Sequence, residues 1–247
     1  MIRGVLLDLD DTLFDHRFAA RQALDAVRQS HACFQALAAD DLEHRHAELL
    51  EELHLRVIAG EIGLDAARRE RFRRLLLSAG VDASPDLAAA TAAAYRDRYQ
   101  QSWQEVEGAT ALLRALQGRV RVGIVSNNLT REQHDKLRFC GFDALLDVVI
   151  ISESAGVSKP DPEIFHIAMR QLGTTADDTV MLGDAWNTDI IGARAAGLRA
   201  IWFNPRHRPR PEAADDVVEI ASLDPAVALP AILRRVEDDR DRTRSRT

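Results

Sequence analysis

Short runs of apolar and β-branched residues recur along the chain and alternate with longer stretches of helical spacing. The runs lie at Ile2–Leu7, Val120–Val125, Val148–Ile151, Thr179–Leu182 and Arg199–Phe203. Between the last four runs, residues 129–139, 162–172 and 188–196 carry apolar side chains at helical spacing. Strands that alternate with helices predict a parallel sheet with right-handed crossovers, to which residues 217–220 add an edge strand.

Glycines mark the ends of the three predicted helices. Gly141, Gly173 and Gly197 each follow a helical stretch. Helices commonly end in a left-handed residue, a conformation that glycine adopts without steric cost. The pattern therefore predicts where each helix stops and the chain returns toward the sheet.

Residues 16–102 differ from the rest of the chain in composition and periodicity. They contain few β-branched runs, are rich in Ala, Leu, Arg and Glu, and place apolar residues at helical spacing. Breaks in this pattern near residues 60–63 and 80–85 predict four helices, inserted after the first strand. The expected boundaries are 1–15 with 103–236 for an α/β core, 16–102 for the helical insert and 237–247 for a disordered tail of mixed charge.

Three acidic residues follow the first predicted strand. Asp8, Asp10 and Asp11 lie at its carboxyl end, and open α/β sheets hold their active crevice along that edge. Carboxylates this close repel one another unless a cation or a proton intervenes. Mg²⁺ prefers oxygen ligands and binds through one or two carboxylates plus substrate phosphate, so the triplet predicts a magnesium site. The alternative is an acidic turn that caps a following helix.

Polar residues also lie at the ends of two later predicted strands and in the turn before one predicted helix. Ser126 and Asn127 end the second strand just before a helix, where hydroxyl and backbone N–H groups form an anion site. Lys159 lies in a Lys-Pro-Asp-Pro turn before a helix, where the prolines can hold it as a fixed positive charge. Asp184 ends another apolar strand, and Asp189 follows on the next loop. These residues are candidates for phosphate and metal binding.

These segments resemble, in order, the four signatures of the haloacid dehalogenase (HAD) superfamily of phosphohydrolases. Asp-x-Asp-x-Thr-Leu at residues 8–13 resembles the first signature, and the strand that ends in Ser126 resembles the second. The turn at Lys159 resembles the third, and Gly-Asp at Asp184 resembles the fourth. Together the four segments span about residues 2–203, which is most of the chain.

The resemblance implies an architecture as well as a chemistry. The expected fold is a Rossmann-like parallel sheet core, the HAD fold, with an inserted α-helical cap domain of the first type at residues 16–102. The Asp-Ile-Ile-Gly-Ala run from Asp189 and the segment Trp202–Pro205 resemble the branch that holds pyrimidine 5′-nucleotidases and N-acylneuraminate-9-phosphatases.

The resemblance also assigns catalytic roles. Asp8 would be the nucleophile that forms an aspartyl-phosphate, which is covalent work that a carboxylate can do. Asp10 would protonate the leaving group and later activate the water that cleaves the intermediate. Lys159 would hold the phosphoryl oxygens and the Asp8 carboxylate. Ser126 and Asn127 would complete the phosphate site.

The metal site implied by the resemblance uses three aspartates. Asp8 and Asp184 would give carboxylates to Mg²⁺, and Asp10 would give its backbone carbonyl. Asp189 would orient Lys159 or the metal-bound waters without binding the ion itself. Thr12 would fasten the turn after the first strand.

Ordinary structural roles remain alternatives for several of these residues. Ser126 or Asn128 would then cap the following helix, and Asp189 would be an acid in a first helical turn. For Asp11 a role in stabilising the turn is the favoured interpretation.

Three histidines in the insert raise the question of a second metal site. His44, His46 and His54 lie among Glu and Arg residues. We interpret them as part of an exposed helix face rather than as a metal cluster.

Composition and charge restrict the kinds of molecule that we expect the protein to bind and the compartment in which we expect it. The 247-residue chain has a net charge of −7 and a pI of about 5.6, which argues against binding to a nucleic-acid backbone but not against a small anionic substrate. Cys33 and Cys140 are far apart and match no metal spacing, as expected in a reducing cytoplasm. No apolar run reaches the ~18 residues needed to cross a bilayer, and no signal segment precedes the first strand. We expect a cytoplasmic protein whose partner is a small phosphorylated metabolite, and the sequence does not indicate its oligomeric state.

The leading hypothesis is a Mg²⁺-dependent phosphatase of a small phosphate monoester, such as a nucleoside monophosphate or a sugar phosphate. A hexose phosphomutase of the same superfamily is the first alternative. A 2-haloacid dehalogenase has less support, because members with that activity lack the second acid, Asp10 here. A non-catalytic scaffold would be free to lose Asp8, Asp10, Lys159 or Asp184, and all four are present.

Overall fold

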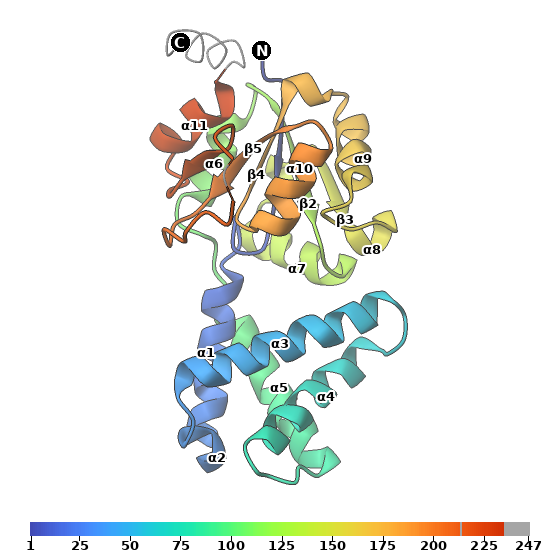
Figure 1. Cartoon of the computed structure of the whole chain (residues 1–247), viewed down its shortest axis with the longest axis vertical. Coiled ribbons are helices and arrows are strands. Elements are labelled where there is room, and N and C mark those ends of the chain that lie inside the picture. The colour runs from blue at the N-terminus through green and yellow to red at the C-terminus, as the bar shows by residue number, and fades with distance from the viewer. Residues whose placement is uncertain (213, 235–247) are drawn as a thin grey trace. The chain divides into compact units, whose positions relative to one another are not determined.

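The computed structural model describes residues 1–212 and 214–234 (Figure 1). The chain separates into two compact units, one made of Met1–Asp15 and the described residues from Gln104 onward, the other of His16–Trp103. We call them the sheet unit and the helical unit. The tail predicted at 237–247 lies outside the described residues.

The sheet unit is built on six parallel strands in the order β3-β2-β1-β4-β5-β6. The strands are β1 (Gly4–Leu7), β2 (Arg121–Ser126), β3 (Val148–Ile151), β4 (Thr179–Gly183), β5 (Arg199–Phe203) and β6 (Val218–Ile220). All five predicted strands and the predicted edge strand are confirmed, and so is the Rossmann-like α/β class. In the central strand, Leu7 lies opposite Ile124 of β2 and Leu182 of β4. The three segments that leave these strands therefore begin side by side.

Helices cover both faces of this sheet (Figure 1). They are α6 (Ala109–Leu116), α7 (Thr130–Cys140), α8 (Ser152–Ala155), α9 (Pro162–Leu172), α10 (Ile191–Ala195) and α11 (Pro225–Leu233), with short 3-10 helices at Asp143–Leu145 and Ala176–Asp178. Helices α9 and α10 lie on one face, and α6 and α11 pack together on the other. The predicted helix ends at Gly141, Gly173 and Gly197 are confirmed, since all three glycines have positive φ angles. Helices α6, α8 and α11 were not predicted.

One face of the sheet shows how the sequence pattern becomes a core. Leu6, Val125 and Met181 are fully buried on three neighbouring strands and belong to one apolar cluster with Ile164 and Phe165 of α9. Burying a side chain of this size contributes about 1.5–3 kcal/mol. The buried sheet holds the loops at its carboxyl edge in fixed positions.

The helical unit consists of four long helices and one short one. They are α1 (His16–Ser30), α2 (Ala32–Gln35), α3 (Ala39–Ile58), α4 (Leu64–Ser78) and α5 (Pro85–Gln101). The four predicted helices are present, and α2 is an addition. Helix α5 packs against α1 and α4, and α3 packs against α4. At the start of α5, Ser84 Oγ accepts a hydrogen bond from the Leu87 N–H at 3.2 Å, and Pro85 occupies the first turn.

The prediction for the histidines is wrong at one position. His44 is exposed and lies beside Glu48, whereas His46 is only 4% exposed and packs among aromatic rings. The histidines form no metal-binding group within the described residues. Among all the residues that the structure describes, no helix is both long enough and apolar enough to cross a membrane.

Candidate active site

The loop after β1 is a tight turn. The carbonyl oxygen of Leu9 accepts hydrogen bonds from the N–H groups of Thr12, Leu13 and Phe14 at 3.3, 2.9 and 2.9 Å. Asp11 has a φ of 63°, a left-handed conformation that Asp tolerates better than most residues. This turn fixes the directions of the side chains on either side of it.

Asp8 lies at the centre of a buried polar cluster. Its Oδ1 is 2.5 Å from Lys159 Nζ, and its Oδ2 accepts a hydrogen bond from Thr12 Oγ1 at 3.1 Å. The same Thr12 oxygen accepts the backbone N–H of Asp184 at 3.1 Å. Lys159 Nζ also lies 2.7 Å from Asp189 Oδ1. The structure thus brings together the ends of β1 and β4 and the turn before α9.

The cluster holds more negative than positive charge. Burial raises the pKa of Asp8 well above its usual range; Lys159 opposes this shift, while Asp189 and Asp184 add to it. Burial, followed by the charges of Asp189 and Asp11, raises the pKa of Asp184 to about 7. Burial alone would lower the pKa of Lys159, but Asp189 and Asp8 outweigh it and raise this pKa.

This donor set fits a hard divalent cation. Asp8, Asp184 and Asp189 each offer a buried carboxylate oxygen within 4.8 Å of the others. Asp189 already uses both oxygens, one for Lys159 at 2.7 Å and one for the Ala185 N–H at 2.9 Å. A cation beside Asp8 and Asp184 would offset the neighbouring negative charges, which together with burial raise the pKa values of these two carboxyls.

A glycine and a π-helix place Asp189 in this cluster. A Cβ on Gly183 would lie 2.3 Å from Asp189 Oδ2, so only glycine fits at the end of β4. The helix predicted to begin at Thr188 begins earlier, as a π-helix from Trp186 to Ile190. Such turns are frequent at functional sites. Trp186 itself is buried against Trp202 with ring centroids 5.0 Å apart, so it is a core residue.

Ser126 and Asn127 both lie at the end of β2, but their side chains have different partners. Asn127 Nδ2 donates to the Lys159 carbonyl oxygen at 2.7 Å, and Asn127 Oδ1 accepts the Lys159 N–H at 2.8 Å. These two bonds clamp the turn that carries the lysine. Ser126 Oγ is buried and accepts a hydrogen bond from Gln133 Nε2 at 2.5 Å.

Helix α7 holds Asp10, a contact that the sequence analysis missed. The Asp10 carboxylate lies 2.6 Å from Lys136 Nζ and accepts hydrogen bonds from Gln133 Nε2 at 2.9 Å and Asn128 Nδ2 at 3.2 Å. Lys136 is 2% exposed, and its Nζ lies 5.1 Å from the centre of the Phe14 ring. The available signal was composition, because Lys136 and Lys159 are the only two lysines in a chain with 32 basic residues.

Two arginines lie beside Asp184 and were also missed. Arg208 Nη2 donates to the Asp184 carbonyl oxygen at 2.7 Å and to its Oδ2 at 3.3 Å. Arg206 Nη2 lies 3.9 Å from the same carboxylate oxygen. Both arginines belong to the loop after β5, where no sequence motif marks them.

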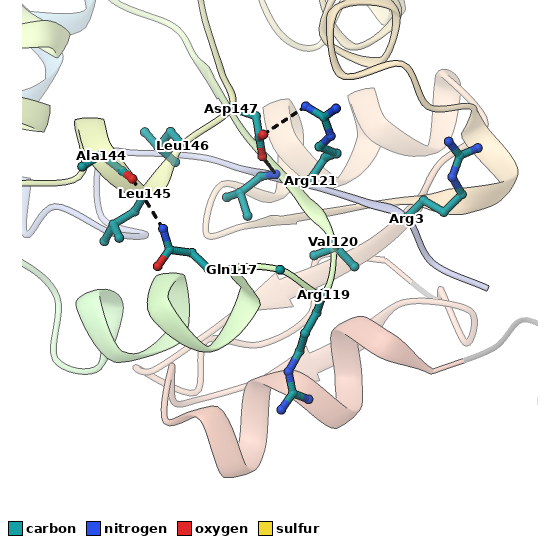
Figure 2. Close-up of a pocket in the computed structure, with 11 residues that line it drawn as sticks. Arg3, Gln117, Arg119, Val120, Arg121, Ala144, Leu145, Leu146 and Asp147 are labelled. Carbon is teal, nitrogen blue, oxygen red and sulfur yellow. Dashed lines mark hydrogen bonds and ion pairs between the residues drawn. The ribbon is translucent and has the colours of Figure 1, made fainter.

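A hollow of about 530 Å³ lies elsewhere in the sheet unit (Figure 2). Its lining includes Arg3, Arg121 and Asp147, which precede or begin strands. Arg121 Nη1 donates to Asp147 Oδ1 at 3.1 Å, as Figure 2 shows. None of the residues of the Asp8 cluster lines this hollow. Since α/β sheets act at the carboxyl ends of their strands, we place the candidate site at the Asp8 cluster.

Residues 2–197 match the family model of the haloacid dehalogenase-like hydrolases. The chain therefore belongs to this family and is an enzyme of the hydrolase class, as the four signatures predicted.

Three individual proteins illustrate the extent of the similarity. The chain is 35% identical over 202 residues to a glyceraldehyde 3-phosphate phosphatase of Methanopyrus kandleri, covering 80% of this chain and 82% of the relative. It is 37% identical over 117 residues to the pyrimidine 5′-nucleotidase YjjG of Escherichia coli, covering 47% and 52%. The HAD-hydrolase YfnB of Bacillus subtilis, solved with bound magnesium, has a TM-score of 0.72 at 28% identity, covering 94% and 99%.

Proposed function

We propose that this hydrolase is a Mg²⁺-dependent phosphatase that cleaves a small phosphate monoester through an aspartyl-phosphate on Asp8. The observation that carries the proposal is the buried Asp8 carboxylate held 2.5 Å from Lys159 Nζ beside two further acids. The relatives named as a glyceraldehyde 3-phosphate phosphatase and a pyrimidine 5′-nucleotidase support a phosphorylated metabolite as the substrate.

The first half of the reaction transfers the phosphoryl group. One Asp8 oxygen attacks phosphorus while the bond to the ester oxygen breaks. Lys159 offsets charge on the phosphoryl oxygens, with the end of β2 at Ser126 and Asn127 supplying further donors. Asp10 gives a proton to the leaving oxygen. When bound by Asp8, Asp184 and the Asp10 carbonyl, Mg²⁺ supplies positive charge to the phosphoryl oxygens.

The second half restores the enzyme. Asp10, now ionised, takes a proton from a water molecule that attacks phosphorus. The bond between phosphorus and the Asp8 oxygen breaks, and inorganic phosphate leaves. Lys136, Gln133 and Asn128 hold the Asp10 carboxylate in place for both proton transfers.

We assign substrate selection to the helical unit, in the role of a cap. All of the residues given a chemical role above lie in the sheet unit. The helical unit is inserted directly after the loop that carries Asp8 and Asp10. A segment that closes over a bound ester excludes water and contacts the leaving group.

Release of inorganic phosphate tests the proposal. Purified enzyme with Mg²⁺ should release one phosphate for each ester consumed, in a screen that includes sugar phosphates and nucleoside monophosphates. A mutase would instead return an isomeric sugar phosphate and free little phosphate. Phosphate release below about a tenth of the substrate consumed, with an isomer formed, would contradict the hydrolase in favour of the mutase.

The charge of the cluster predicts how stability depends on pH and Mg²⁺. The pKa of Asp184 is about 7 in the folded metal-free protein against an ordinary value of 3.8, so the folded state binds more protons between these values. Lowering the pH from 8 to 6 should therefore stabilise the metal-free protein, by about 1 kcal/mol or about 2–4 °C in Tm.

Thermal melts of the wild type and Asp184→Asn provide the check. The variant should lack this rise, and saturating Mg²⁺ should remove it from the wild type by keeping the carboxylate ionised. Mg²⁺ should also raise Tm more at pH 8 than at pH 6. Equal Mg²⁺ shifts in the wild type and Asp184→Asn would mean that Asp184 is not a ligand.

The contacts of Asp10 predict a selective defect for Lys136→Met. Without Lys136 the proton donor is poorly held, which matters most when the leaving group is a poor one. The kcat/KM for alkyl phosphates should fall by about 10–100-fold, a part of the 10²–10⁴ that acid–base catalysis supplies. The kcat/KM for p-nitrophenyl phosphate should fall less than about threefold, since p-nitrophenolate needs little help from an acid.

Arg131→Met is the matched control, because Arg131 is on the same helix with a side chain that is 93% exposed. It should leave both rates unchanged. An equal loss for both kinds of ester in Lys136→Met would indicate general damage to the fold and would refute the role in positioning Asp10.

A further inference from the structure

Arg208, in the loop after β5, donates hydrogen bonds to both the backbone and the side chain of Asp184. Its Nη2 lies 2.7 Å from the Asp184 carbonyl oxygen and 3.3 Å from Oδ2 of the carboxylate. The terminal nitrogens of a guanidinium carry two hydrogens each, so one Nη2 can serve both acceptors. Together the two bonds fix how the carboxylate is turned relative to its own backbone.

The positive groups around this carboxylate gather at one of its two oxygens. Arg206 Nη2 also approaches Asp184 Oδ2, at 3.9 Å, which is close enough for an ion pair but too long for a hydrogen bond. Among the residues that the structure describes, no donor or cation contacts Asp184 Oδ1. Because Oδ2 already accepts from a guanidinium, Oδ1 is the oxygen that is left for a metal ion.

Trp202 supports the side chain of Arg208. The Arg208 Cζ lies 5.7 Å from the centre of the Trp202 ring, within the range of a cation–π contact. Trp202 is fully buried, and its Nε1 donates to the Asp184 carbonyl oxygen at 2.9 Å. This carbonyl oxygen therefore receives two donors, one for each lone pair. The contact of Arg208 with Asp184 thus does not depend on the carboxylate alone.

Asn204 fixes the backbone that carries Arg208. It is fully buried, its Oδ1 accepts the Arg208 N–H at 2.9 Å, and its Nδ2 donates to the Arg208 carbonyl oxygen at 3.0 Å. Asn204 is in turn bound to β6, through Glu219 Oε1 at 2.7 Å and the Ile220 carbonyl oxygen at 2.7 Å. All of these residues lie in the sheet unit. The sheet therefore sets the position of the arginine.

Mg²⁺ and Ca²⁺ use a carboxylate in different ways. Mg²⁺ demands octahedral geometry, whereas Ca²⁺ takes about six to eight oxygens and often binds both oxygens of one carboxylate. A carboxylate that is limited to one oxygen suits Mg²⁺ and denies Ca²⁺ a ligand. The shortest bond of Arg208 goes to the Asp184 carbonyl oxygen, which a cation on the carboxylate leaves untouched. The arginine and the cation can therefore hold Asp184 together.

We propose that Arg208 is a positioning residue that restricts Asp184 to one metal-binding oxygen and thereby selects Mg²⁺ over Ca²⁺. Arg208 holds Oδ2, Trp202 and Asn204 hold Arg208, and Oδ1 binds the cation. The proposal rests on the proposed function, because it takes Asp184 as a ligand of the Mg²⁺ that the phosphatase uses. It supplies a reason for the choice of ion, since clustered carboxylates alone accept either cation.

The ratio of two dissociation constants tests the proposal. The Kd values of Mg²⁺ and Ca²⁺ are measured by isothermal titration calorimetry, without substrate, for the wild type and Arg208→Met. The Kd of Ca²⁺ divided by that of Mg²⁺ should fall by about tenfold in the variant, the lower end of the effect of residues that orient a metal ligand. The ratio is the decisive quantity, because loss of one positive charge strengthens the binding of both divalent cations alike.

Arg206→Met is the matched control. It removes the same charge from beside the same oxygen, but Arg206 makes no hydrogen bond to that oxygen, so the ratio should stay at the wild-type value. Asn204→Ala releases the backbone of Arg208 and should lower the ratio as well. Combined with Arg208→Met, it should lower the ratio no further than Arg208→Met alone, because the two residues act as one unit.

The variants must be folded for this comparison. The Arg208 side chain is 39% exposed, so Arg208→Met should fold, and circular dichroism in a chelator checks each variant. An unchanged ratio in folded Arg208→Met would overturn the proposal. Tighter binding of both cations by the same factor is one such result, and it would mean that the arginine competes with the ion.

Failure of this proposal and failure of the proposed function give different results. Saturable binding of both cations with an unchanged ratio would refute the role of Arg208 and keep the metal site. A lowered ratio in an enzyme that turns over no ester would keep the role of Arg208 and refute the phosphatase. If neither cation bound to the wild type, the metal site itself would be refuted, and the role of Arg208 with it.

Discussion

Replacing Asp8 with Asn is expected to abolish turnover. The amide is a far weaker nucleophile than the carboxylate, so no phosphoryl-enzyme forms, and loss of an essential nucleophile costs at least about 10⁴-fold in kcat. The fold should survive, because the change removes one of three buried carboxylates and Lys159 keeps its contact with Asp189 at 2.7 Å. Phosphate release and a thermal melt of the same sample give both results.

Asp11→Asn is the control for this variant. Asp11 is the adjacent acid in the sequence and has a φ of 63°, a conformation that Asn also tolerates. It should therefore retain most of the activity. If Asp8→Asn, checked by mass spectrometry for deamidation back to Asp, kept more than about one per cent of the wild-type rate, Asp8 would not be the nucleophile.

Lys159→Met is expected to lower kcat/KM for all phosphate esters by a similar factor. Lys159 acts on the phosphoryl group that they share, and loss of one fixed donor to developing charge costs about 10²–10³-fold. Its removal also leaves Asp8 and Asp189 buried without their cation, so the free energy of unfolding should fall by about 3–5 kcal/mol. Lys159→Arg should not restore activity, because a wider planar group must enter a site where Lys159 is 4% exposed.

The other lysine of the chain provides the contrast. Lys159→Met should reduce the rates for alkyl and p-nitrophenyl esters together, whereas Lys136→Met should separate them. Circular dichroism at the assay temperature shows whether each variant is folded. A Lys159→Met enzyme that is folded and retains wild-type kcat/KM on every ester would refute the role of the lysine.

The architecture could be predicted because its signals are local. Each strand is a short apolar run, and the glycines at 141, 173 and 197 end helices where the chain needs a positive φ. Helix α8 escaped prediction because it has only four residues. Helix α6 follows the helical unit rather than a strand, and α11 has no strand after it, so neither is framed by two strands as in a βαβ unit. The π-helix at Trp186–Ile190 depends on the close approach of Asp189 to Gly183, which no sequence period reveals.

The residues of the candidate site likewise fall into those that local sequence signals reveal and those that only the packing of helices brings together. Residues that end a strand, such as Asp8, Ser126 and Asp184, could be found because parallel strands align their carboxyl ends. Lys136 lies on a helix face, and its contact with Asp10 depends on how α7 packs, so spacing alone could not reveal it.

Trapping the intermediate tests the central claim most directly. The enzyme is mixed with Mg²⁺ and a good substrate, quenched in acid within the first turnover, digested and analysed by mass spectrometry. The peptide that contains Asp8 should gain the mass of one phosphoryl group, which alkali removes and which is absent from Asp8→Asn. Release of phosphate with no modified peptide, or with the phosphoryl group on another residue, would contradict the aspartyl-phosphate mechanism.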